Sequence, residues 1–249
     1  MQQACSGLNV ICRHSWNHFL SLATVWYNHT HRSIGSIKAQ NNQDSIARLE
    51  KQQTSILART NEWRSFLQAR LLRTTDALQR EHEQVSLFAA RVSSFLIMSA
   101  LDPLDLVWDD LADRCYDALT LLSRALSEIP DAEMPTPLLD DKVVPMLHYI
   151  TQHCRDKEVR EKGLKLLERC ITKTSPWDIR GSLLGMQAFL EVEEGGRDGK
   201  GNIPATARYK WVLAQWNEEH TEYSLKIRSL GSAEERLLTV TTVAADLAF

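Results

Sequence analysis

Apolar residues recur at three- and four-residue steps along most of the chain, which places them on one face of an α-helix. The first pattern predicts a short helix over about 13–27, and the polar segment 29–44, with a glycine and an asparagine pair, predicts a connection. A longer helical pattern then begins at Asp44 or Ser45. Its stripe, expected to face the core, comprises Leu49, Ile56, Thr60, Trp63 and Leu67.

Two more helices are predicted before the first proline-rich segment. An apolar helix over about 83–100 is expected to end at the Leu-Asp-Pro of 101–103, because proline cannot continue a helix. The next helix covers about 105–128. Its apolar face carries Leu111, Cys115, Leu119 and Leu122. The segment PDAEMPTP (130–137) contains three prolines and predicts a loop, a candidate joint or subdomain boundary.

A helical hairpin is predicted after this loop, from patterns over 140–154 and 157–171 that meet at Arg155 and Asp156. The stripe of its second helix comprises Val159, Gly163, Leu166, Leu167 and Cys170. Relative to alanine, Gly163 costs this helix about 1 kcal/mol.

The stretch SPWDIRGSLLGMQAFLEVEE (175–194) has the features of a helix start. Ser175 can cap the helix, Pro176 suits the first helical position, and Asp178 lies three residues after the cap. The helix is expected to end before GGRDGKGN (195–202), a glycine-rich surface loop. The acidic residues Glu191, Glu193 and Glu194 are interpreted as a solvated helix end rather than a catalytic pair.

The period changes to two after residue 208. Trp211, Leu213 and Gln215 alternate with their neighbours, as do Tyr223, Leu225 and Ile227 after a polar turn. This predicts a β-hairpin at about 208–229, and residues 232–249 are expected to form a closing helix. The fold class is therefore mainly α, a multi-helix orthogonal or bundle domain with a small C-terminal β-hairpin. We divide it into an N-terminal helix with its polar connection (1–44) and a helical domain (45–249).

Composition and charge fit a folded domain that does not coat nucleic acid. Hydrophobic residues make up 43% and charged residues 24%, and the net charge is −3. Residues 1–100 contain 11 Lys or Arg against 6 Asp or Glu, whereas residues 101–249 contain 18 against 26. The basic half is interpreted as a solvated face. The apolar run 85–101 contains Arg91 and is shorter than a membrane span, so a buried helix is expected.

Motifs for catalysis, metal binding or phosphate binding are missing from the sequence. The five cysteines include no Cys-x-x-Cys pair, and their odd number argues for a reducing compartment. Neither His14 and His18 near Cys12 nor His148 and His153 near Cys154 have the spacing of a zinc site. The chain also lacks a Gly-x-Ser-x-Gly nucleophile and a Gly-x-x-x-x-Gly-Lys phosphate loop. We therefore expect no enzyme activity, no metal and no cofactor.

The order of features from about 45 to 229 resembles the C-terminal regulatory region of fungal-specific binuclear zinc cluster transcription factors, the type associated with secondary-metabolite gene clusters. The similarity rests on the helix VREKGLKLLERC (159–170), the Trp177–Asp178 pair and the acidic EVEE (191–194). It also rests on the IPATAR segment, with Ile203, Pro204 and Arg208, and on the strand pair that follows.

The resemblance implies a non-enzymatic regulator of transcription that acts through protein partners or as a homodimer, in the nucleus or cytoplasm. The six-cysteine DNA-binding module of that family is missing, so direct nucleic-acid binding is not expected. The alternative is a helical accessory or scaffold protein of such a pathway, or an enzyme with an unrecognised site. A small-molecule effector is not identified, and its place would be between the helices of 83–128 and the hairpin of 143–171.

Individual residues of the family-like segment are given structural roles. Trp177 is expected to pack the first turn of its helix against the preceding hairpin, with Asp178 as the reciprocal cap. Arg208 is expected to pair with an acidic side chain such as Asp178 or Glu191.

Overall fold

The structure, a computed structural model, describes the backbone of residues 2–127, 143–171, 177–232 and 234–241, and within these every side chain except those of 2–14 and 177–179. The chain forms two compact units, Met1–Pro103 and Leu104–Phe249, called here the N-terminal and C-terminal units. Each is described by itself. The expectation of a mainly α fold with a small C-terminal antiparallel sheet is confirmed.

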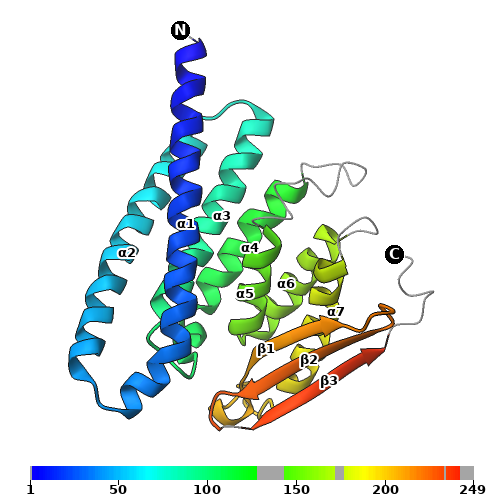
Figure 1. The fold of residues 1–249 in the computed structure, drawn as a ribbon. Coiled ribbons are helices and arrows are strands. Elements are labelled where there is room, and N and C mark those ends of the chain that lie inside the picture. The colour runs from blue at the N-terminus through cyan, green and yellow to red at the C-terminus, as the bar shows by residue number, and fades with distance from the viewer. Residues whose placement is uncertain (1, 128–142, 172–176, 233, 242–249) are drawn as a thin grey trace. The chain divides into compact units, whose positions relative to one another are not determined.

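The N-terminal unit contains the helices α1 (Gln2–Ala39), α2 (Gln43–Leu71) and α3 (Ala77–Ser99), which contact one another in all three pairings (Figure 1). Side-chain caps mark where two of them begin: Asn42 accepts from the Ser45 N–H, and Asp76 accepts from the Gln79 N–H. In α2, Thr60 and Leu67 are buried, whereas Trp63 is only half-buried. Only part of the stripe predicted on α2 is therefore buried in the core.

The prediction of a connection over 29–44 was wrong, because α1 continues to Ala39 and only a short turn separates it from α2. Its inward face is regular at steps of three and four residues. The buried positions are Trp16, Leu20, Ala23, Tyr27, Thr30 and Ile34. The serines, histidines and asparagines between these positions lie on the outer face, where polarity does not oppose a helix.

The helices of the C-terminal unit are a 3₁₀ segment η1 (Leu106–Leu111), then α4 (Ala112–Ser127), α5 (Val144–His153), α6 (Lys157–Cys170) and α7 (Trp177–Glu194). The hairpin prediction is confirmed, since α5 and α6 contact each other and α6 also contacts α4 and α7. The apolar stripes predicted for α4 and α6 are buried, including Cys115 in α4 and Cys170 in α6. Helix α7 ends where the glycine-rich loop begins, also as predicted.

Gly163 lets α5 and α6 approach closely, which corrects its interpretation as a mere weakness. A Cβ atom at this position would lie 2.2 Å from Oγ1 of Thr151 on α5. No such contact is sterically tolerated without a shift, so alanine does not fit there as the helices stand.

A short 3₁₀ turn η4 (Ala205–Ala207) leads into a three-stranded antiparallel sheet of β1 (Tyr209–Trp216), β2 (Glu222–Ser229) and β3 (Glu235–Thr241), in the order β1-β2-β3 (Figure 1). The predicted hairpin is confirmed. The prediction of a closing helix over 232–249 was wrong for the first part of this segment, because residues 235–241 form a strand paired with β2. Residues 242–249 lie outside the described part of the chain.

The alternation in β1 is interrupted by a bulge between Trp211 and Leu213, which places Ala214 opposite Leu225. Leu213 is 54% exposed, so the predicted alternation in β1 does not correspond to a regular buried face. In the central strand β2 the alternation holds, and Tyr223, Leu225 and Ile227 are buried.

Helix α7 packs on β1 and β2 through two glycines spaced four residues apart. A Cβ atom at Gly181 would lie 2.3 Å from the Tyr223 ring, and one at Gly185 would lie 2.4 Å from the Trp211 ring. The glycines therefore make the room in which the aromatic side chains of the sheet pack against the helix.

Several sequence predictions lie outside the described residues. These are the loop 130–137, the capping roles of Ser175 and Pro176, and the side-chain roles of Trp177 and Asp178. The described backbone does begin α7 at Trp177.

Candidate functional site

The IPATAR segment, residues 203–208, folds into a turn that is closed by its own arginine. Ile203 is buried, and its carbonyl oxygen accepts a hydrogen bond of 2.9 Å from Nε of Arg208. Pro204 precedes the η4 turn, and its carbonyl oxygen accepts from the Ala207 N–H at 2.9 Å. The family-like residues Ile203, Pro204 and Arg208 are thus brought together at the entry to β1.

Arg208 is paired with an acidic side chain, as predicted, and this side chain is that of Asp109. The Nη2 atom of Arg208 lies 2.5 Å from Oδ2 of Asp109, and its Nη1 atom donates to the Asp105 carbonyl oxygen at 3.2 Å. Glu191, one of the two predicted partners, is exposed. The predicted pairing with Glu191 was wrong because the guanidinium turns towards η1, about a hundred residues earlier in the chain.

Asp105 makes a second set of contacts in the site. Its backbone has a φ of 57°, a left-handed conformation that aspartate tolerates better than most residues. Its carboxylate is fully buried, and Oδ2 lies 2.8 Å from Nδ1 of His153 at the end of α5. The His153 ring stacks on the Trp108 ring, with centroids 5.3 Å apart. The aspartate thereby fixes the orientation of the imidazole, and the indole covers its face.

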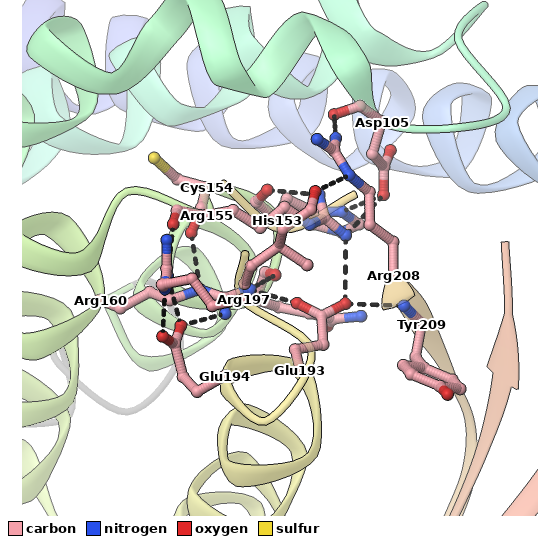
Figure 2. Close-up of polar contacts among 12 residues, drawn as sticks. Asp105, His153, Cys154, Arg155, Arg160, Glu193, Glu194, Arg197, Arg208 and Tyr209 are labelled. Carbon is pink, nitrogen blue, oxygen red and sulfur yellow. Dashed lines mark hydrogen bonds and ion pairs between the residues drawn. The ribbon is translucent and has the colours of Figure 1, made fainter. Parts of the chain in front are cut away.

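Glu193 is the central carboxylate of the site, and it is fully buried near the end of α7 (Figure 2). Its Oε1 atom accepts the Tyr209 N–H at 2.7 Å and lies 3.4 Å from Nη2 of Arg155. Its Oε2 atom pairs with Nη2 of Arg160. One carboxylate thus joins α7 to the first residue of β1 and to the α5–α6 connection.

Arg160 caps the end of α5 from the first turns of α6. Its Nε donates to the Cys154 carbonyl oxygen at 3.0 Å and its Nη2 to that of Gln152 at 3.3 Å. The same guanidinium reaches Oε1 of Glu194 at 2.7 Å through Nη1. Carbonyl groups at a helix end need such donors, so Arg160 satisfies the backbone and the carboxylates together.

Arg197 closes the outer side of the site. It forms two hydrogen bonds of 2.6 Å with the two carboxylate oxygens of Glu194, and its Nη2 also donates to the Arg155 carbonyl oxygen. Partial burial by itself would raise the pKa of Glu194, but the hydrogen bonds from Arg197 and Arg160 outweigh it and lower that pKa.

Together these residues form what we call the buried ion cluster. Its carboxylates belong to Asp105, Asp109, Glu193 and Glu194, and its guanidinium groups to Arg155, Arg160, Arg197 and Arg208. Asp105, Glu193, Arg155, Arg160 and Arg208 are at most 4% exposed. The cluster orders the junction of five elements, and its charged groups pair with one another.

The interpretation of the EVEE segment as a solvated helix end was wrong for Glu193, whereas Glu191 is indeed exposed. A signal was present in the sequence. Glu193 lies three and four residues after Leu190 and Phe189, which are buried on the inner stripe of α7. Extending the helical period to the last turn would have placed Glu193 inside.

Cys115, Cys154, Cys170 and His153 are buried in the C-terminal unit. Desolvation by the surrounding protein, and secondarily the nearby His153, lowers the pKa of His148 to about 4. The Cys115 and Cys154 thiols are fully buried and hydrogen-bonded to each other, which raises the pKa of Cys115 and lowers that of Cys154. Among the residues whose side chains are described, no group of three His, Cys, Asp or Glu is arranged to hold a metal ion. Cys12 and His14 fall outside those residues.

The N-terminal unit contributes two surface hollows, one of about 590 Å³ and one of about 320 Å³. The larger is lined by side chains of α1 and α2, the smaller by side chains of α2, and Arg59 lines both. The predicted effector site between 83–128 and 143–171 involves both units and stays a prediction. No helix within the described ranges is both long and apolar enough to cross a bilayer. No protein family, curated protein or solved structure matches this chain.

Proposed function

We propose that the chain is a non-enzymatic regulatory domain that acts through protein–protein contacts, of the type found in the effector region of fungal binuclear zinc cluster transcription factors. The observation that carries the proposal is the buried ion cluster. Its carboxylates and guanidinium groups are paired with one another around the buried Glu193 and Arg160, so they hold α5, α6, α7, η1 and β1 together. This is the arrangement expected of a platform that presents surfaces.

The placement of the family-like residues supports the same proposal. Arg208 and the acidic end of α7 both belong to the ion cluster, and Ile203 supplies the carbonyl that orients Arg208. Ile203, Arg208 and Glu193, three of the residues on which the resemblance rests, thus have structural roles at one junction. A regulator built on this platform binds its partners elsewhere, on exposed helical faces such as those of α1 and α2.

A tethering experiment tests the proposal directly. The full chain is fused to a heterologous DNA-binding domain, and reporter output is measured in fungal cells against the DNA-binding domain alone. We expect output to rise or fall at least about threefold. A Glu193→Ala fusion, which loses the centre of the ion cluster, is expected to lose the effect.

The matched control is Glu191→Ala, which removes an exposed carboxylate two residues away in the same helix. This fusion is expected to retain the output of the unmodified chain at equal protein level by immunoblot. A silent reporter in both activation and repression formats, with the fusion present in the nucleus, would overturn the regulatory proposal and favour a scaffold role.

A further inference from the structure

Two cysteine side chains of the C-terminal unit are in direct contact. Cys115 lies on the buried stripe of α4, and Cys154 directly follows the last residue of α5. Both are free and fully buried, and their thiols are hydrogen-bonded to each other. Cys154 also lies beside the buried ion cluster, where its carbonyl oxygen accepts from Nε of Arg160 at 3.0 Å (Figure 2). Two thiols held in contact by the fold are the starting arrangement for a disulfide bond.

The surroundings of Cys154 favour its thiolate. The hydrogen bond from Cys115 is the main cause of the lowered pKa of Cys154, and the Asp156 backbone N–H and the Arg160 guanidinium act in the same direction. Burial and the Asp156 carboxylate oppose them and are outweighed. Asp156 is the N-cap of α6, so the sulfur lies at a helix N-terminus beside an arginine. These are the surroundings in which proteins activate a cysteine.

The surroundings of Cys115 favour its neutral thiol. The same hydrogen bond, and then burial, raise the pKa of Cys115, and the nearby Arg114 offsets only part of this increase. As the pH rises, Cys154 therefore loses its proton first. Because the thiolate and not the thiol reacts with oxidants, the two cysteines have different roles: Cys154 reacts first, and Cys115 attacks the product.

The pair lies directly beneath exposed residues. The side chain of Asp156 is exposed, although its backbone N–H is bonded to the Cys154 sulfur. Arg114 and Tyr116, which flank Cys115 in the sequence, are exposed as well. Opening of the short α5–α6 connection therefore suffices to bring a small oxidant to the Cys154 sulfur, without unfolding of the unit.

We propose that Cys154 and Cys115 are a site of reversible oxidation, at which a hydroperoxide oxidises Cys154 and Cys115 then closes a disulfide. The Cys154 sulfur attacks one peroxide oxygen and the O–O bond breaks, so that the other oxygen leaves as water with the Cys154 proton. The Cys115 sulfur then attacks the sulfenic acid and the S–O bond breaks, which releases a second water with the Cys115 proton. Two thiols and one hydrogen peroxide thus give one disulfide and two waters, and a dithiol reductant restores both thiols.

The test uses the purified full chain, reduced and then freed of reductant, in a molar excess of hydrogen peroxide. After treatment the chain is unfolded, its remaining thiols are blocked with N-ethylmaleimide, and it is digested with trypsin. Mass spectrometry is expected to find the tryptic peptides 115–124 and 143–155 joined by a disulfide. The joined peptides are expected to be absent before treatment and absent again after dithiothreitol.

Serine variants test the two roles separately. In Cys115→Ser the sulfenic acid on Cys154 has no thiol to attack it, so dimedone, which labels sulfenic acids, is expected to label Cys154 at least about tenfold more than in the unmodified chain. In Cys154→Ser, dimedone is expected to leave Cys115 unlabelled. Cys170→Ser removes an equally buried cysteine outside the pair and is expected to retain the disulfide. Circular dichroism checks that each variant keeps its helical content.

Three results would overturn the inference. They are failure of the folded, unmodified chain to form the disulfide, its formation only after the chain is unfolded in urea, and labelling by dimedone at Cys115 instead of Cys154. The first two need no variant, so they decide the matter even if a substitution prevents folding. The inference goes beyond the proposed function and does not depend on it: a silent reporter leaves the oxidation site intact, and a missing disulfide leaves the regulatory proposal intact.

Discussion

The two compact units bury polar groups in different ways. In the N-terminal unit, Glu83 is the one charged residue in the described part that is buried, and it pairs with Arg70 at 2.6 Å. In the C-terminal unit the buried ion cluster lies at the junction of α5, α6, α7, η1 and β1. The first unit is built from long helices joined by short turns, and the second from elements up to a hundred residues apart.

This difference follows from the number of backbone N–H and carbonyl groups that each architecture leaves without a hydrogen bond inside its own helix or sheet. Long helices bond their backbone internally and need side-chain partners only at their ends. The shorter helices and the sheet of the C-terminal unit meet at many termini, where carbonyl and N–H groups require buried donors and acceptors. Arg160 and Glu193 supply them, and each must then have a counter-charge. The unit with more buried ends therefore has more buried ions.

The largest expected effect is on the ion cluster. Glu193→Ala leaves Arg155 and Arg160 without their central carboxylate and the Tyr209 N–H without its acceptor. We expect the free energy of unfolding of the C-terminal unit to fall by about 3–5 kcal/mol, measured by urea denaturation with hydrogen exchange read separately on 15–103 and 104–241. The exposed Glu191→Ala is the control. Equal stability of the two variants would refute the contrast between the units.

The second-largest effect is the dependence of the unfolding free energy on pH that His148 causes. Its pKa is lowered from 6.5 to about 4, so the unfolded chain binds a proton first as the pH falls. Stability is therefore present above pH 6.5 and is lost towards pH 4, by at most about 3 kcal/mol. His148→Phe is expected to flatten this part of the pH profile, whereas replacement of the exposed His29 leaves it unchanged. If stability falls with pH equally steeply in both variants, groups other than His148 cause the pH dependence.

A smaller effect is expected at the close contact between α5 and α6. Helix propensity alone favours Gly163→Ala by about 1 kcal/mol, but its Cβ atom meets Thr151 Oγ1 at 2.2 Å. Overpacking costs about 1–3 kcal/mol, so the net result is destabilisation, measured by thermal unfolding.

Two further variants separate the packing cost from the propensity. Gly199→Ala, with nothing within 4 Å of the new Cβ, is expected to change stability little. Adding Thr151→Ala to Gly163→Ala should recover part of the loss, since it removes the atom that clashes. Stabilisation by Gly163→Ala alone would show that the helices move apart without cost.

The smallest effect is expected in the N-terminal unit. Thr30 lies on the buried stripe of α1, and its hydroxyl has no hydrogen-bond partner within the described residues. Thr30→Val keeps the shape and removes a buried polar group, so stability is expected to rise by about 1 kcal/mol in denaturant unfolding. The exposed Thr54→Val is the control. A loss of stability in Thr30→Val would mean that this hydroxyl is satisfied after all.

The sequence predicted the helical pattern of the C-terminal unit but not its site. The buried stripes of α4 and α6 and the hairpin of β1 and β2 were found correctly, because they depend on local periodicity. Arg208 was expected to be paired, but its partner Asp109 lies 99 positions away. The spacing of residues along the sequence cannot show which of many distant carboxylates pairs with Arg208.

The two wrong elements show where local patterns fail. The polar composition of segment 29–44 predicts a connection, although Thr30 and Ile34 continue the buried stripe of α1. Residues 235–241 were expected to be helical, and they form β3 because the edge of β2 offers a ladder of hydrogen bonds. Pairing with a neighbouring strand outweighs a weak local preference.

The sequence by itself determined the helical class of this protein, most of its element boundaries and the turn that leads into the sheet. Only the tertiary structure decided which charges are buried and which glycines allow close packing. The physical reason is that periodicity acts within a few residues along the chain, whereas ion pairing and steric fit depend on groups that folding alone brings within a few ångströms of one another.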